Sequence, residues 1–255
     1  MRVIYAIAIN TFREAVRDKI LYAMLAFALV MLGGSLLVAE LTIGEYTKII
    51  KDLGLALISI FGLMIAVFVG IGLVYKEIQR KTIYTIASKP VPRWQFLLGK
   101  YSGLVLTLAA EVAIMGLGFA LILELSGATE RIVLVPAVWL TFVELMVVTA
   151  IAVLFSCFST PTLSALFTIG LTVIGRLTAP LLEVVQAGDN ESLQQFARLL
   201  YRLLPDLQTF NMRADAAYGR PVDWEWVAYS TGYGFVWTAL LLVLASAIFQ
   251  YRDFK

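Results

Sequence analysis

Residues 133–157 read VLVPAVWLTFVELMVVTAIAVLFSC, a stretch in which Glu144 is the only charged side chain. A bilayer with a hydrocarbon core about 30 Å thick needs about 20 mainly apolar residues for each helical crossing, so this stretch predicts a membrane-spanning helix. Five further stretches meet the same length. The six predicted spans lie near residues 20–39, 53–75, 97–123, 133–157, 160–182 and 228–250. We therefore predict an all-α membrane protein in which residues 1–255 form a single transmembrane domain.

The overall composition agrees with a membrane location and excludes several kinds of chemistry. Apolar residues make up 60% of the chain and charged residues 15%, against roughly 45–50% and about 25% in soluble domains. The net charge of +2 does not favour nucleic acid as a partner. With no histidine and one cysteine, Cys157, the chain can form neither an HExxH zinc site nor a Ser-His-Asp triad. We expect no catalytic residue, and no metal or cofactor bound by this chain.

The distribution of Lys and Arg predicts the orientation in the membrane. An even number of crossings places both termini on one side. The N-terminal segment, the connection after the second span and the C-terminal tail together carry twelve Lys and Arg, against seven spread over the longer connections on the other side. Because basic residues favour the cytoplasmic side, both termini are predicted to be cytoplasmic, in a multi-pass protein of the cell (inner) membrane.

Two segments outside the spans show the pattern of amphipathic helices. Residues 1–19 combine an apolar stripe with a charged face that includes Arg13, Glu14 and Arg17, which predicts an interfacial helix in the cytoplasmic headgroup layer. The alternative is a continuous, overlong first span. Residues 183–227, the longest connection on the outer face, contain an amphipathic helix that begins near Ser192 and ends before Pro205. This outer-face helix is expected to rest on the outer leaflet or to cap the spans, and a cap could either only seal the bundle or act as a substrate gate.

The cytoplasmic connection over residues 76–96 begins KEIQRKTIYTIASKPVPRW at residues 76–94. Ile83 and Ile86 share one face of a short helix, charged groups cover the rest, and Pro90 ends it. This pattern favours a rigid lever whose apolar ridge could bind in the groove of a partner. The alternative is an ordinary interfacial helix that carries positive-inside charges.

The loop resembles the first cytoplasmic loop of the permeases of the type-two ABC exporter superfamily, in which an acidic residue precedes a basic step, a Ser-basic-Pro-Val turn and a later Gly-Lys. The matching residues are Glu77, Arg80, Lys81, Thr82, Ile83, Ser88, Lys89, Pro90, Val91, Arg93, Gly99 and Lys100. Further matches are FREAVRDK at 12–19, LPDLQTFN at 204–211 with Tyr218-Gly219, and FQYRDF at 249–254. The last two resemble the branch of the nitrous-oxide-reductase-maturation permease. One departure is Lys81-Thr82, where many members carry Gly-Thr.

This resemblance implies an exporter permease whose six spans pair with a second six-span subunit, as a homodimer or a heterodimer. Two copies of a separate cytoplasmic ATPase subunit would bind the coupling helix of the 76–96 loop. The implied coupling residues are Glu77, Arg80, Lys81, Thr82, Lys89, Pro90 and Arg93. No Gly-x-x-x-x-Gly-Lys-Ser/Thr occurs in the chain, so ATP and Mg are expected on the partner subunit.

Three charged residues lie deep inside predicted spans, away from their ends: Glu111, Glu144 and Arg176. A charge at mid-membrane costs about 2.5–3.5 kcal/mol on insertion scales, so each is expected to have a partner. Glu111 and Arg176 lie at similar depths in spans that run in the same direction. We therefore predict that Arg176 bridges one or both glutamates and fixes the bundle; the alternative is a polar lining of the translocation path.

Two other functional classes remain open at this point. An ion- or proton-coupled secondary transporter or channel could use Glu111, Glu144 and Arg176, although the sequence has no internal repeat. A membrane enzyme is disfavoured because no predicted span contains aspartate or histidine. The apolar bundle suits a lipid, a hydrophobic peptide or a drug-like molecule as substrate, and equally a mechanical ABC device that moves nothing across.

Overall fold

The computed structural model describes residues 2–40, 46–79, 92–127, 133–186 and 191–251. Within these ranges the regular structure is helical, with no strand. Six helices are long and apolar enough to span a membrane, which confirms the predicted fold class. They are α2 (Lys19–Glu40), α3 (Tyr46–Gln79), α5 (Arg93–Leu125), α6 (Leu134–Ser156), α7 (Pro161–Gln186) and α10 (Trp224–Tyr251).

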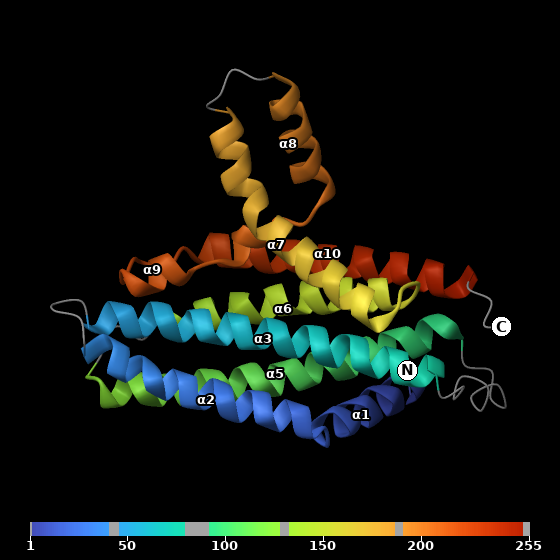
Figure 1. Ribbon diagram of the computed structural model, residues 1–255, viewed down its shortest axis with the longest axis horizontal. Helices are drawn as coiled ribbons and strands as arrows, with labels where there is room; N and C mark the ends of the chain where they lie inside the picture. Colours follow the sequence, from blue (N-terminus) through green and yellow to red (C-terminus); the bar gives the residue numbers. More distant parts are fainter. Residues whose placement is uncertain (1, 41–45, 80–91, 128–132, 187–190, 252–255) are drawn as a thin grey trace.

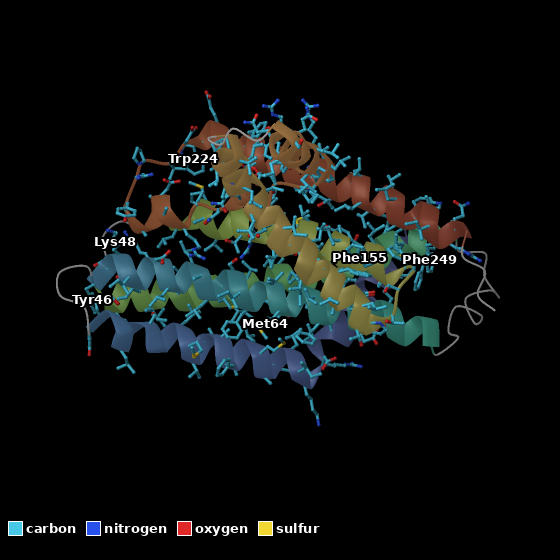
Figure 2. All side chains as sticks on the ribbon, turned by 45° about the horizontal axis from the view of Figure 1, so that its top comes forward. Tyr46, Lys48, Met64, Phe155, Trp224 and Phe249 are labelled. Atoms are coloured by element: carbon cyan, nitrogen blue, oxygen red, sulfur yellow. The ribbon has the colours of Figure 1, made fainter. Side chains whose placement is uncertain are left out.

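The long helices α2, α3, α5, α6 and α10 run side by side along the long axis of the molecule (Figure 1). The start of the chain and the end of α10 lie at the same end of this bundle, here called the terminus end. At the opposite end, here called the far end, α2 and α5 end and α3 begins. Figure 2 shows Phe249 at the terminus end and Lys48 at the far end.

The central helix of the bundle is α6, which packs against α3, α5, α7 and α10. Its residues are apolar around the whole circumference, as expected of a helix that is surrounded by protein. The helix backbones approach closely where glycine faces a neighbour. A Cβ atom on Gly62 of α3 would lie 2.5 Å from the Leu145 side chain of α6. Short side chains therefore set the spacing of the core helices.

Residues 2–40 form two helices, α1 (Arg2–Val16) and α2, rather than one continuous span. The break falls at Arg17 and Asp18, and the Asp18 carboxylate accepts a hydrogen bond of 3.0 Å from the backbone N–H of Ile20. This bond satisfies one of the free N–H groups at the start of α2. The alternative of an overlong first span is therefore wrong, whereas the location of α1 in the headgroup layer stays a prediction.

The long connection after α7 contains α8 (Glu191–Leu203), the 3₁₀ turn η1 (Leu207–Phe210) and α9 (Arg213–Ala217). Figure 1 shows the last part of α7 and α8 as a hairpin that extends from the side of the bundle. By contrast, η1 packs on α6 and α7, and α9 packs on α3 and α6. The elements that lie on α3 and α6 are therefore η1 and α9, whereas the role of α8 on the outer face stays a prediction.

The hairpin leaves the bundle and returns to it at one point. Gly175 of α7 lies against the chain that follows α8, where a Cβ atom on Gly175 would be 2.8 Å from the carbonyl oxygen of Pro205. Directly after Pro205, Asp206 caps η1 by accepting hydrogen bonds from the Gln208 N–H (3.0 Å) and the Thr209 hydroxyl (3.1 Å). Residues 176–204, here called the α7–α8 hairpin, thus begin and end at neighbouring positions.

Candidate functional site

The first candidate site is the ion pair between α6 and α7. Arg176 donates a hydrogen bond of 2.7 Å from Nε to Oε1 of Glu144, and a second one of 2.7 Å from Nη2 to the hydroxyl of Ser59 on α3. The carboxylate is buried and the guanidinium is partly exposed. One arginine therefore joins three helices at the base of the α7–α8 hairpin. A buried pair of this kind is costly to break, because the remaining charge loses its partner.

A small polar cavity of about 40 Å³ lies beside this ion pair. Its wall includes Ser59, Glu144 and Arg176, and residues of η1 and α9 close it. Since one water molecule needs about 10–15 Å³ of such a cavity, the cavity holds only a few water molecules. Arg213, at the start of α9, lies on this wall and pairs with Asp52 of α3 at 3.5 Å. The site is too small for a lipid or a peptide, so its geometry supports a structural role.

Glu111 does not take part in this pair. It is 2% exposed on α5, and within the described ranges neither of its carboxylate oxygens has a hydrogen-bond partner. The structure therefore brings together two of the three predicted intramembrane charges. The similar predicted depths of Glu111 and Arg176 were not enough to make them a pair, because the rotation of each helix about its axis decides which neighbour a side chain meets.

The second candidate site lies at the start of α5, where α1 packs on it. A Cβ atom on Gly99 would lie 2.7 Å from Cβ of Ile7, and one on Gly103 would lie 2.6 Å from the carbonyl oxygen of Ala8. Thr11 of α1 is also fully buried. Two glycines four residues apart let two helix backbones approach closely, as in helix pairs within membranes. We call this contact the α1 seat.

An ion pair accompanies the α1 seat. The Lys100 side chain is 2% exposed, and its Nζ lies 3.7 Å from Oε2 of Glu14. Arg13 and Arg17, predicted together with Glu14 as interfacial residues, are exposed. Only Glu14 of these three therefore faces α5. The sequence pointed to Gly99-Lys100 as a motif but not to its partner helix.

Arg93, the first residue of α5, is bonded to the end of α10. Its Nη1 donates hydrogen bonds to the carbonyl oxygens of Phe249 (3.0 Å) and Gln250 (3.2 Å). The rings of Phe96 and Phe249 stack with centroids 6.4 Å apart. A cation at a helix C-terminus satisfies free carbonyl groups and complements the helix dipole. The chain that leaves the 76–96 loop is thus fastened to the last span.

The sequence pattern of the ABC-2 family transporter proteins matches residues 5–254. The chain belongs to this ABC-2 transporter family. It is accordingly a multi-pass membrane protein of an ABC transporter, a permease. No curated protein matches this chain closely enough to count as a relative.

Most predicted coupling residues of this ABC-2 protein lie outside the described ranges: Arg80, Lys81, Thr82, Lys89 and Pro90. Glu77 lies in the last turn of α3, where only the backbone is described. Among the described coupling residues, Arg93 has contacts that can be followed, and these include the hydrogen bonds to the end of α10.

Sequence reasoning missed Ser59, Asp52 and Arg213 of the first site in this ABC-2 protein, and Thr11 and Gly103 of the second. A serine in an apolar span carries no signal of its own, because hydroxyls in helices commonly bond to the preceding turn. Asp52 and Arg213 lie far apart in the sequence, and their pairing depends on where α9 folds back. Among the described residues no group of three acidic or cysteine side chains could hold a metal ion.

Proposed function

We propose that this chain is the permease subunit of an ATP-driven exporter, driven from the cytoplasmic side by a separate ATPase through the 76–96 loop. The observation that carries the proposal is the set of contacts made by the first turns of α5. Arg93 bonds α5 to α10, and Gly99 and Gly103 bring α1 against it. A displacement of the loop that precedes Arg93 would therefore move three helices together.

The proposed partners are two copies of an ABC ATPase, which hold ATP and Mg, and a second six-span subunit. Glu77, Arg80, Lys81, Thr82, Lys89 and Pro90 are the proposed contacts with the ATPase. The charge and spacing of these residues support this role. For Arg93 we propose transmission instead of direct contact, because its guanidinium is bonded to α10. The terminus end is then the cytoplasmic end, in the inner membrane.

The substrate path is proposed between two permease subunits. The cavity beside Arg176 is too small for a substrate, and the pairing of Arg176 with Glu144 favours a role in holding helices together. The separation of Glu111 from that pair also gives little support to a proton or ion path through all three charges. The outer loop and the C-terminal sequence support placement in the nitrous-oxide-reductase-maturation branch.

Co-purification tests this proposal. The chain is expressed together with a candidate ABC ATPase subunit, and the ATPase retained per permease is measured. The double variant Arg80→Ala, Lys81→Ala is expected to lose the ATPase, because it removes two cations of the lever. Arg220→Ala, an exposed cation of the far end, is the matched control and should retain it. Unchanged retention in the double variant, or transport by the purified chain alone in liposomes, would contradict the proposal.

A further inference from the structure

A groove lies on the outside of the bundle between α5 and α10. Both helices pack on the central helix α6, which contributes Met146 to the floor of the groove. The volume of this groove, here called the α5–α10 groove, is about 680 Å³. Sites that bind small molecules have volumes of roughly 300–1,000 Å³. The α5–α10 groove is therefore large enough for a ligand, unlike the cavity beside Arg176.

The groove exists because α10 presents short side chains where it passes α5. Ala239, Ser246 and Ala247 line it from α10. Larger side chains line it toward its two ends, with Trp94 near the terminus end and Phe235 at the other. Both alanines are exposed, so the space beside them is open to whatever surrounds the span.

The inner surface of the groove is mainly apolar. Tyr101 is 6% exposed, and its hydroxyl donates a hydrogen bond of 3.1 Å to the carbonyl oxygen of Met146. The Thr238 hydroxyl lies beside that of Tyr101. Because these polar groups are gathered at one place and turned toward the protein, the rest of the surface suits a hydrocarbon chain, which binds by burial of its methylene groups.

The length of the groove matches one leaflet of a bilayer. Its lining on α10 extends from Gln250 to Phe235, which is about 22 Å at a rise of 1.5 Å per residue. Half of the hydrocarbon core is about 15 Å thick, and the headgroup layer adds roughly 5–8 Å. A groove that begins at the membrane surface and ends near the midplane fits a single lipid of one leaflet.

The mouth of the groove carries groups that suit a lipid headgroup. Trp94 and Gln250 are exposed there, and tryptophan favours the level of the headgroups. Arg93 is also exposed, and its Nη1 donates a hydrogen bond of 3.2 Å to the carbonyl oxygen of Gln250. Because a carbonyl group is neutral, this bond does not cancel the charge of the guanidinium. That charge is complementary to a lipid phosphate.

We propose that an anionic glycerophospholipid of the leaflet at the terminus end binds in the α5–α10 groove, with one acyl chain against Met146 and its phosphate beside Arg93. The lipid then packs on both α5 and α10, the two helices that the hydrogen bonds of Arg93 join. Only the assignment of this leaflet to the cytoplasmic side rests on the proposed function.

Lipid titration followed by native mass spectrometry tests the site. The full chain is purified in detergent, stripped of lipid, and titrated with phosphatidylglycerol or with phosphatidylcholine of the same acyl chains. The lipids bound per chain are counted at each concentration. One phosphatidylglycerol should bind about fivefold more tightly than phosphatidylcholine, because one cation near the membrane surface favours an anionic headgroup by about this factor.

Two variants place a larger side chain in the groove, Ala239→Leu and Ala247→Leu. Because both alanines are exposed, the added leucine extends into the groove and not into the core. Each variant should bind phosphatidylglycerol about tenfold more weakly, the factor expected when about two methylene groups of the lipid are excluded. Val236, which is 67% exposed on α10 outside the groove, gives the matched control. Val236→Leu should bind as the parent chain does.

Thermal unfolding of each variant is measured beside the titration, and if one alanine variant is unstable the other decides. Unchanged affinity in a stable alanine variant would overturn the groove as the binding site. Equal affinity of the parent chain for the two lipids, a comparison that needs no variant, would overturn the anionic headgroup. Because the titration contains no ATPase, a failure to bind lipid leaves the proposed function intact, and a failure of the co-purification test leaves the groove intact.

Discussion

Helices α1 and α8 are both amphipathic in sequence, but α1 packs closely against a neighbouring helix and α8 remains largely exposed. Helix α1 places short buried residues, Ala8 and Thr11, against Gly99 and Gly103 of α5. Helix α8 packs on α7 and remains exposed over most of its surface. The difference shows that an amphipathic pattern predicts a helix, but does not predict where that helix packs. The place of packing depends on the surface of the partner helix. For α1 that surface is made by two glycines, and α8 meets no comparable surface within the described chain.

The largest expected effect comes from filling the α1 seat. Gly103→Leu should lower the free energy of unfolding by about 3 kcal/mol, because its side chain meets backbone as well as side-chain atoms of α1. Thermal unfolding in nanodiscs measures this loss, and cysteine labelling at Ala8 reports detachment of α1. Gly33→Leu on α2 is the matched control, since a Cβ atom there meets nothing within 4 Å. Equal stability of the two variants would show that the seat does not hold α1.

The next effect concerns the base of the α7–α8 hairpin. Glu144→Gln should cost about 2 kcal/mol, because Arg176 then lacks a counter-charge in a partly buried site. Glu111→Gln is the matched comparison and should change stability by less than about 0.5 kcal/mol, since no described pair is broken. Denaturant unfolding in the same detergent measures both. A Glu111 variant as damaging as the Glu144 variant would argue that Glu111 has an essential partner.

A smaller effect is expected where α5 meets α10. Arg93→Ala removes two hydrogen bonds to the end of α10, and should weaken the last turn by about 1 kcal/mol. Hydrogen exchange of the amides near Phe249 should then accelerate by about fivefold, while exchange at the centre of α6 stays unchanged. Arg17→Ala serves as the control, because Arg17 is exposed on the loop between α1 and α2. Unchanged hydrogen exchange near Phe249 in the Arg93 variant would show that Arg93 does not stabilise the end of α10.

The smallest effect on stability should come from α8. Leu203 is 63% exposed, so Leu203→Gln should change the free energy of unfolding of a single copy by less than about 0.5 kcal/mol. Unfolding is therefore measured at low protein concentration in excess detergent, so that each micelle holds a single copy. A loss above about 1 kcal/mol would mean that α8 already has a seat within one chain, and would remove the contrast with α1.

The spans could be predicted because crossing a bilayer fixes a length of apolar sequence. The partner of Arg176 was harder to predict than the spans. The depth of a side chain follows from the 1.5 Å rise per residue along its helix, whereas the direction in which it faces depends on how that helix is rotated in the bundle. Arg176 was therefore placed at the right level, and Glu144 rather than Glu111 is the carboxylate that it meets. Gly99 was predicted only as part of a Gly-Lys motif and Gly103 was not singled out, and both lie against α1, for which the sequence suggested lipid headgroups.

Arg93 shows a different limit of sequence reasoning. The family resemblance implied that Arg93 contacts an ATPase subunit, which stays a prediction, and the structure adds that its side chain bonds to the end of α10. No pattern in the sequence connects residues 93 and 249, because the contact is made only when the first turn of α5 lies beside the last turn of α10. Contacts between the ends of distant helices depend on the whole bundle.

The meeting of Gly175 and Pro205 brings the two ends of the α7–α8 hairpin together, so its part beyond the span, which ends at Leu182, can change in length without separating them. A segment whose two ends nearly touch can be exchanged, shortened or enlarged without moving the scaffold that carries it. A short glycine-serine bridge in place of residues 176–204 would also delete Arg176, so a graft that retains this arginine is the practical design. A change confined to the outer part of this segment would leave the contacts of α5 with α1 and α10 unaltered.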